Sequence, residues 1–232
     1  MSSWPAIAAA NNAEWCDAVC RTHGIETEGD GRAWTSRTRT PPLYPDAVTL
    51  VADPSASELL ARIDASLGCS IKDSFASLDL TGHGFRVLFD AQWIIRGPSD
   101  PGAVPASPRW RVVRDVEGFT AWEDAWRGPD GPLGVLRADL LRTKAVTLLA
   151  AQVDDRIVGG VVLSRSPTVV GISNFFTEER ITSESWQGCL ALVSALFPGV
   201  TLVGYESRDA LDAARAHGFE AVGPLQVWLR DG

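Results

Sequence analysis

The chain has 232 residues and a formal net charge of -8, from 29 acidic and 21 basic side chains. A chain of this length buries a full hydrophobic core without disulfides or metal ions, and it suffices for one large domain or two small ones. Its 45% hydrophobic and 22% charged residues exclude a disordered, collagen-like or coiled-coil protein. Because an acidic surface repels phosphate backbones, we expect no nucleic-acid partner.

The sequence carries no signal for export or membrane insertion. No apolar run reaches the roughly 20 residues that cross a bilayer, and residues 1–13 include no Lys or Arg. The four cysteines are too few and too scattered for a disulfide framework. We therefore expect a cytoplasmic protein without a membrane partner.

The N-terminal part, residues 1–96, is predicted to be an α/β domain. Its predicted elements are a helix at 15–23, a strand at 47–51, a helix at 55–67 capped by Ser55 or Ser57, and a strand at 85–95. The following residues 97–108 hold four prolines and two glycines, which sustain neither a helix nor a central strand. They are interpreted as a linker between two domains.

The C-terminal part, residues 109–232, has a longer readable order. Its predicted elements are a strand at 110–114, helices at 116–127 and 135–143, strands at 145–153, 156–164 and 168–176, a helix at 183–196 with Ser183 as N-cap, a strand at 200–205, a helix at 210–217 and a strand at 222–229. The three consecutive strands are apolar almost throughout, which is typical of strands buried on both faces.

Two short segments recur in the two parts. Val48-Thr-Leu-Val51 matches Val200-Thr-Leu-Val203, and His83-Gly-Phe85 matches His217-Gly-Phe219. Each copy of the first segment is followed by a helix, and each copy of the second by a strand. The pattern favours a partial internal duplication, although β-branched tetrapeptides also recur by chance in strands.

The element order of 110–229 resembles that of the GNAT superfamily of N-acetyltransferases. Three local pieces carry the resemblance: the strand around Val170–Phe176, the helix 183–196 after it, and Arg215-Ala-His-Gly-Phe219 before the last strand. The resemblance implies an α/β fold with a mixed α+β sheet, the GNAT-like acyl-CoA acyltransferase fold. The N-terminal part then resembles a partial second copy.

The resemblance also implies a site. In the family the fourth and fifth strands splay apart, so the main chain of Ser173, Asn174, Phe175 and Phe176 is expected to pair with the pantetheine arm of acetyl-CoA or another acyl-CoA. The start of the next helix, with Arg180 and Ser183, is expected to hold the pyrophosphate. The acceptor is expected to be an amine of a small molecule or peptide.

Tyr205 and Glu206 end the predicted fifth strand, beside this cleft. An amine loses a proton as it attacks a thioester, so a carboxylate or phenol here can act as base or acid. These two residues are the predicted catalytic residues.

The chain departs from the family pattern at two points. The loop Thr177–Glu184 has no glycine and carries three glutamates, and Ala214 stands where the family usually has a tyrosine as general acid. Three alternatives therefore stay open: an N-acetyltransferase, a degenerate binding module that kept the cleft without acyl transfer, and a structural protein. A homodimer is also left open.

Other clusters favour ordinary packing. Cys16, Cys20 and His23 share one helix face, but structural zinc sites use four ligands, so we expect no metal. Trp122 and Trp126 lie one turn apart and line either the cleft or the core, with the core favoured. The sequence contains no Gly-x-Ser-x-Gly segment, the turn that carries the nucleophilic serine of α/β-hydrolases, so it gives no indication of such a hydrolase.

Overall fold

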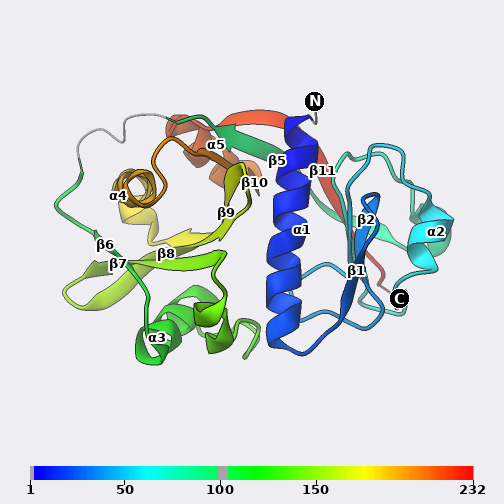
Figure 1. Ribbon diagram of the computed structural model, residues 1–232, viewed down its shortest axis with the longest axis horizontal. Coiled ribbons are helices and arrows are strands. Elements are labelled where there is room, and N and C mark those ends of the chain that lie inside the picture. The colour runs from blue at the N-terminus through cyan, green and yellow to red at the C-terminus, as the bar shows by residue number, and fades with distance from the viewer. Residues whose placement is uncertain (1–2, 99–103, 232) are drawn as a thin grey trace. The chain divides into compact units, whose positions relative to one another are not determined.

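The computed structural model describes residues 3–98 and 104–231, and the chain forms two compact units (Figure 1). The first unit holds the described residues up to Trp93 together with those from Ala221, and the second runs from Ile94 to Glu220. This division differs from the predicted boundary, because the last strand belongs to the first unit. Residues 99–103 of the predicted linker lie outside the described residues.

The first unit is a mixed α/β unit. Its elements are α1 (Trp4–Thr22), β1 (Thr27–Gly29), β2 (Ala33–Ser36), β3 (Ala47–Thr49), α2 (Ala56–Leu60), β4 (Ser70–Asp73), a 3-10 turn η1 (Thr81–His83), most of β5 (Arg86–Arg96) and nearly all of β11 (Glu220–Leu229). The strand order is β1-β2-β3-β4-β11-β5, in which β3 and β4 run parallel and β4 and β11 antiparallel. Its core includes Ile71, Leu80, Phe85 and Trp228.

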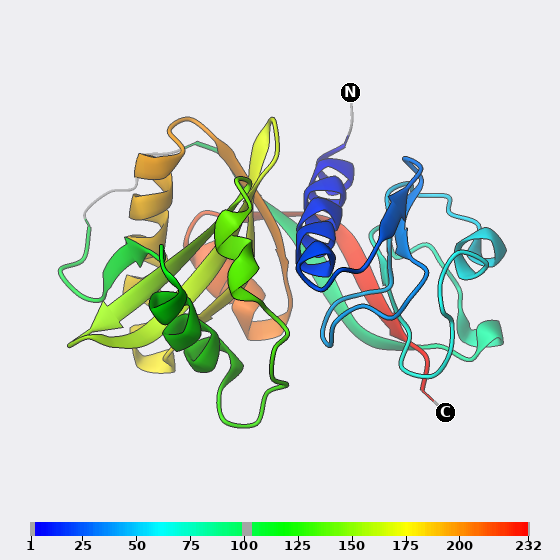
Figure 2. The same cartoon turned by 60° about the horizontal axis from the view of Figure 1, so that its bottom comes forward.

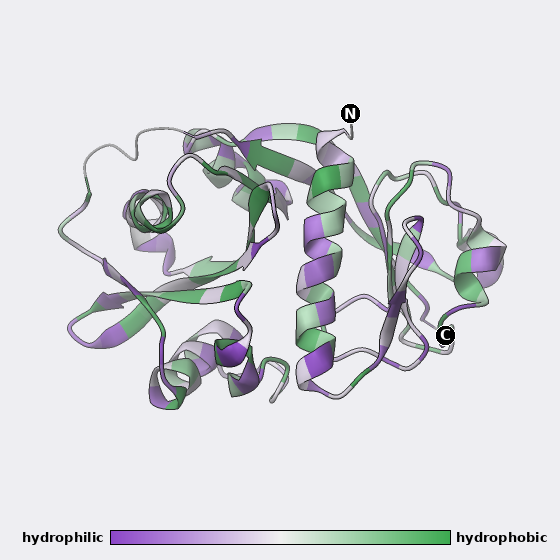
Figure 3. Cartoon of the chain, in the orientation of Figure 1, coloured by the Kyte–Doolittle hydropathy of each residue, from purple (hydrophilic) through white to green (hydrophobic). Residues whose placement is uncertain are grey.

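Helix α1 is longer than predicted. It begins at Trp4 with Ser3 as N-cap, and Pro5 lies in the first turn, where no N–H is required. Figure 3 shows alternating hydrophobic and hydrophilic bands along it. Two buried asparagines contribute to this pattern, and one of them, Asn12, accepts a hydrogen bond from the buried Lys72 Nζ at 2.7 Å. This polar partner allows a buried asparagine within the helix.

Helix α2 is shorter than predicted and ends at Leu60. The predicted cap is confirmed, since the Ser55 hydroxyl accepts from Glu58 N at 3.3 Å. Strands β1, β2 and β4 were not predicted, because each has only three or four residues and none shows a long alternation.

The second unit carries the resemblance named above. Its elements are β6 (Arg109–Val112), α3 (Val116–Arg127), the 3-10 turn η2 (Ala138–Arg142), β7 (Val146–Val153), β8 (Arg156–Arg165), β9 (Val169–Thr177), the 3-10 turn η3 (Glu179–Ile181), α4 (Thr182–Leu196), β10 (Thr201–Glu206) and α5 (Arg208–Ala216). The strand order is β5-β10-β9-β8-β7-β6. The strands β6 to β9 form an antiparallel meander, and β10 joins β9 in parallel.

One predicted helix is wrong. The segment 135–143 forms only the short 3-10 turn η2, in which Leu140 is the fully buried residue. A single anchor does not provide the amphipathic face on which most helices depend. The mixed α+β sheet and the order of the other elements in this unit are as predicted.

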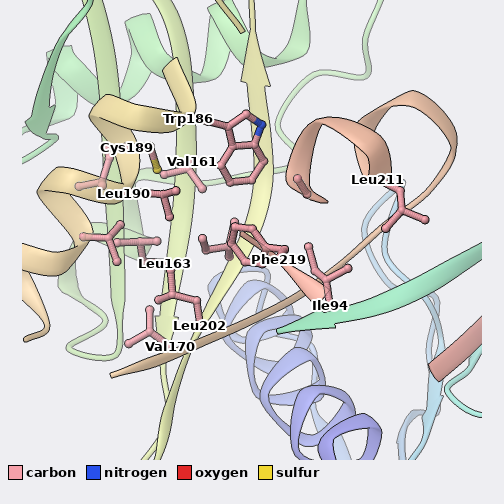
Figure 4. Packing of buried hydrophobic residues seen from close by; sticks show 14 residues of the cluster. Ile94, Val161, Leu163, Val170, Trp186, Cys189, Leu190, Leu202, Leu211 and Phe219 are labelled. Carbon is pink, nitrogen blue, oxygen red and sulfur yellow. The ribbon is translucent and has the colours of Figure 1, made fainter. Parts of the chain in front are cut away.

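Helices cover both faces of the second unit's sheet. Figures 1 and 2 place α4 on one face and α3 with η2 on the other. The core under α4 and α5 is shown in Figure 4, where Trp186, Leu190 and Phe219 pack against Ile94 and Leu202 from the strands. This packing fixes the strands whose ends form the candidate site.

The two His-Gly-Phe segments form the same turn. Gly84 and Gly218 have φ of 78° and 83°, a left-handed conformation that glycine adopts without strain. Phe85 N donates to Leu80 O and Phe219 N to Ala214 O, and each ring is buried in the core of its own unit. The shared turn fits the duplication, which stays a prediction.

Candidate functional site

Strands β9 and β10 are paired along only part of their length. Their parallel register joins Val169–Gly171 to Thr201–Val203 and ends there, although β9 continues to Thr177 and β10 to Glu206. At the last point of close approach, a Cβ on Gly204 would lie 2.8 Å from the Ile172 carbonyl oxygen. Beyond Gly204 the main-chain edges of β9 and β10 face each other, but their residues are no longer paired.

A β-bulge lies in β9 beside this opening. The β8 register passes from Val162 opposite Ser173 to Gly160 opposite Phe176, so Asn174 and Phe175 together face Val161. Asn174 has φ of 55°, in the left-handed region that asparagine tolerates better than most residues. A bulge leaves its extra residue out of the ladder, which exposes main-chain groups of Ser173–Phe176 to another partner.

The two rings of β9 lie on opposite faces and are used in packing. Phe175 stacks on Trp186 of α4, with ring centroids 4.0 Å apart. Phe176 meets Trp122 of α3 edge to face at 5.3 Å. The contribution of these two residues to a ligand therefore rests on their main chain.

The tryptophans of α3 belong to this packing. Trp122 is fully buried and its indole N–H donates to Leu149 O at 2.8 Å. Trp126 stacks on Trp122 at 6.2 Å and is half-buried. The interpretation as core residues holds for Trp122.

The end of β10 places Tyr205 and Glu206 next to each other, both half-buried. Adjacent residues of a strand point to opposite faces of the sheet, so the side chains of Tyr205 and Glu206 lie on opposite sides of β10. Burial raises the pKa of the Glu206 carboxyl from 4.5 to about 7, because desolvation disfavours its charged form. A carboxylate poised near neutrality is suited to accept a proton.

The start of α4 differs from the prediction. Ser183 is exposed and lies inside the first turn instead of capping the helix, which begins at Thr182 directly after η3. The hydroxyls of Thr177 and Ser185 are 2.7 Å apart and tie the end of β9 to the helix. Because η3 extends the helical turn backwards, the first free N–H groups lie earlier than the sequence suggests.

Arg180 is engaged by a neighbouring carboxylate. Its Nε and Nη2 donate to Glu178 Oε2 at 3.0 and 2.7 Å, and Arg156 Nη1 donates to Glu178 Oε1. The two guanidinium groups hold the pKa of the Glu178 carboxyl below its usual value, with Arg156 first. The carboxylate of Glu178 is therefore held by two positive charges.

The cysteines of α1 are buried thiols. Burial raises the pKa of Cys16 to about 11 and that of Cys20 to about 12, so neither offers a thiolate at neutral pH. Within residues 3–98 and 104–231, no three His, Cys, Asp or Glu side chains gather as metal ligands. In the same ranges, no helix is both long enough and apolar enough to span a membrane.

Sequence reasoning missed two features of the site. Arg156 opens β8, far in sequence from the loop that it contacts, and nothing in its neighbourhood marks it. The bulge was also missed, although an asparagine inside an apolar strand is a weak signal for a left-handed residue. Ser173, Asn174, Phe175 and Phe176 are brought together at the open end of β9, and Tyr205 and Glu206 end the neighbouring strand.

Comparisons with known proteins bear on the fold. No protein-family model and no curated protein matches the sequence. A GCN5-related N-acetyltransferase from Kribbella flavida superimposes with a TM-score of 0.66 at 14% identity, over 97% of this chain and 96% of its own. A conserved protein of unknown function from Staphylococcus epidermidis gives 0.61 at 12% identity, over 90% and 95% of the two chains. A GCN5-related N-acetyltransferase-like protein from Streptococcus suis gives 0.52 at 14% identity, over 88% and 82%.

These similarities confirm the GNAT-like acyltransferase fold predicted from the element order. The match to the Kribbella flavida protein covers nearly the whole of both chains, so both units of this chain have counterparts there.

Proposed function

We propose that this chain, which has the GNAT fold, transfers an acyl group from acetyl-CoA or another acyl-CoA to an amine of a small molecule or peptide. The observation that carries the proposal is the parting of β9 and β10 after Gly171 and Val203, with a bulge on one side and two ionisable residues on the other. Fold likeness alone does not assign an activity, so the proposal rests on this site.

The open edge of β9 suits the pantetheine arm. Amide groups of the arm can pair with the main chain of Ser173–Phe176 as an added strand would. Since the rings of Phe175 and Phe176 are held in packing on the two faces, the main chain is kept in one conformation before the donor arrives. A preformed edge lowers the entropy cost of binding.

Glu206 is the proposed base. The amine nitrogen attacks the thioester carbonyl carbon, the C–S bond breaks, and coenzyme A leaves as its thiol while the nitrogen loses a proton. A Glu206 carboxylate can take that proton near neutral pH because burial has raised its pKa to about 7. Tyr205, on the same strand end, is the proposed donor of a proton to the leaving sulfur.

Binding and turnover test this proposal separately. Acetyl-CoA and longer acyl-CoAs should raise the melting temperature saturably, because a ligand that binds only the folded state stabilises it. Release of the coenzyme A thiol with a panel of amines then reports turnover, with Tyr205→Phe and Glu206→Gln as variants. Absence of any thermal shift with every donor contradicts the proposal, and unaltered turnover in both variants contradicts the assigned roles.

A binding module without catalysis is the second candidate. It is favoured by the segment Thr177–Glu184, which has three glutamates and no glycine, and in which Arg180 is already paired with Glu178. This candidate predicts saturable binding of acyl-CoA with no thiol release above the background rate for any amine.

A further inference from the structure

Strand β6 is the free edge of the second unit's sheet. It stands last in the strand order, and among the described residues β7 is its one neighbour. At the end of this ladder Val113 N donates to Leu148 O at 2.9 Å. Hydrogen-bonded pairs alternate along an antiparallel ladder, so Trp110 and Val112 turn their N–H and C=O groups away from β7. These main-chain groups can pair with an added strand.

Three exposed arginines lie on this edge or directly after it. Arg109 and Arg111 belong to β6, and Arg114 follows it. None of the three forms an ion pair or a side-chain hydrogen bond with another described residue. At the edge strand of the first unit, in contrast, Glu28 accepts a hydrogen bond from Arg37 Nε at 2.8 Å. The charges at β6 are therefore available to an added anion, in a chain that has 29 acidic and 21 basic side chains.

The side chains of β6 alternate between the two faces of the sheet. The ring of Trp110 faces α4, because a Cβ on Gly188 would lie 2.4 Å from its Cδ1. Arg109 and Arg111 therefore point to the opposite face, which α3 covers (Figure 1). An added strand would thus meet an aromatic ring on one face and two positive charges on the other.

A hollow flanks the edge on each face. The hollow on the α4 side has a volume of about 400 Å³, and its lining is mainly apolar, with Val104, Pro105, Trp110 and Leu192. The hollow on the α3 side has a volume of about 590 Å³, and in it Arg111 and Gln152 face the small residues Gly118 and Ala121. The two sides of one edge therefore suit side chains of different chemistry.

Carboxylates further along the second hollow limit what binds there. Asp115, Glu117 and Asp155 also line it. Asp115 is used as the N-cap of α3, since its Oδ1 accepts from Gly118 N at 2.7 Å. A long polyanion such as a nucleic acid would be repelled by these three carboxylates, whereas single carboxylates beside Arg111 would not. The charge pattern therefore favours an acidic peptide.

We propose that β6 binds an extended segment of a partner protein in which acidic and apolar residues alternate. The main chain of the segment pairs with Trp110 and Val112 as an added strand. Residues opposite each other in a ladder share a face, so the acidic side chains lie beside Arg109 and Arg111 and the apolar ones enter the hollow beside α4. This binding goes beyond the proposed acyl transfer and does not depend on it.

A second copy of the chain is a poorer occupant of the same edge. Two β6 strands related by a two-fold axis through the sheet would run antiparallel and keep their faces. Arginine would then lie opposite or next to arginine on one face, and like charges opposite each other destabilise a strand pair.

The probe is a capped peptide of alternating glutamate and valine, and calorimetry gives its dissociation constant. Peptides with glutamine or lysine in place of glutamate test the charge, and a peptide with its glutamates and valines in two separate blocks tests the alternation. The variant chain carries Arg109→Gln and Arg111→Gln together. Arg165→Gln is the matched control, because Arg165 is an exposed arginine at the end of β8 that also lacks an ion-pair partner among the described residues.

The expected result is selective for charge and pattern. The double variant should bind the probe about three- to tenfold more weakly, the range for two exposed charge pairs. Arg165→Gln should change the dissociation constant by less than about twofold. The glutamine and block peptides should bind more weakly than the probe, and the lysine peptide should not bind measurably. Both variant chains should melt like the unmodified chain, because the replaced side chains are exposed.

Main-chain pairing has a signature that charge attraction lacks. In an added strand alternate N–H groups point toward β6 and the others point away. N-methylation of every glutamate blocks one set, and N-methylation of every valine blocks the other. One of the two methylated peptides should therefore lose binding while the other keeps most of its affinity.

Three outcomes would overturn the proposal. Equal behaviour of the two methylated peptides would exclude strand addition, and equal binding of the glutamate and lysine peptides would exclude a role for the arginines. If no peptide binds the unmodified chain, the proposal is wrong, and sedimentation as a dimer would then assign the edge to a second copy.

Discussion

Gly171 and Val203 form the last register pair between β9 and β10. One position further, Gly204 lies so close to Ile172 that a side chain there would touch the Ile172 carbonyl oxygen. Strand separation therefore starts from a point of tight contact. The opening is a defined structural feature, since a paired segment precedes it and the bulge at Asn174 follows it on β9.

Replacing Gly204 by alanine should disturb this point. The new Cβ would lie 2.8 Å from the Ile172 carbonyl oxygen, and a backbone atom cannot move away cheaply. We expect a loss of about 1–3 kcal/mol in the free energy of unfolding, the usual cost of overpacking. We also expect weaker binding of acyl-CoA, because the strand edge must shift. Denaturant unfolding and calorimetric titration measure the two effects.

Gly82→Ala is the matched control for this substitution. A Cβ at Gly82 meets nothing within 4 Å and its φ is not left-handed, so we expect neither loss. Equal stability of the two variants would show that Gly204 is not a point of close approach.

The bulge predicts a difference between two replacements of Asn174. The left-handed φ of 55° costs a β-branched residue about 1–3 kcal/mol, whereas glycine adopts it freely. Asn174→Val should therefore lose stability and acyl-CoA affinity, and Asn174→Gly should keep both nearly unchanged. Melting curves with and without acetyl-CoA measure both. Similar behaviour of the two variants would contradict a role for the bulge geometry.

Long periodic segments explain why the second unit could be predicted. Helix α3 was predicted with its observed bounds of Val116–Arg127, and the bounds of β7, β8 and β9 differ from those predicted by one residue at most at each end. Their apolar patterns extend over eight or more residues, so burial determines them. The short strands β1 and β2 were missed because a few residues give no period.

The site was less predictable than the fold. Tyr205 and Glu206 were chosen for their place at a strand end, and the raised pKa of Glu206 depends on burial by residues distant in sequence. The ion pairs of Glu178 likewise depend on Arg156, which the β8–β9 register brings near. Local sequence does not encode such neighbours. Ser183 was assigned as a cap because the backward extension through η3 has no sequence signal.

The raised pKa of Glu206 predicts the pH dependence of the reaction. The base must be ionised, so kcat/KM should rise with pH through about 7 and then level off. An arylamine acceptor, which is uncharged over this range, removes the ionisation of the amine from the profile. Glu206→Gln should lower kcat/KM by about 100-fold or more and remove the inflection near 7. An inflection that persists in Glu206→Gln would assign it to another group.

The raised pKa of Glu206 also predicts an effect on stability. Ionisation of Glu206, which should increase activity, should lower the free energy of unfolding. Folding raises the pKa of Glu206 from 4.5 to about 7, so the folded state holds this proton more tightly than the unfolded state. Below pH 4.5 the carboxyl is protonated in both states and there is no penalty. As the pH rises through 7 the folded chain must carry a desolvated charge, and stability is lost by an amount on the order of 2–3 kcal/mol.

Glu206→Gln removes this ionisation and resembles the protonated form in shape. We therefore expect the variant to be more stable than the unmodified chain at pH 8, by an amount on the order of 2–3 kcal/mol, and equally stable near pH 4.5. Urea unfolding at the two pH values measures the difference. Glu184→Gln, at an exposed position, should show no such dependence. A variant that gains stability while losing turnover is expected where a buried charge is retained for catalysis. Equal stability at both pH values would mean that Glu206 is not desolvated, and its assignment as the base would lose its physical reason.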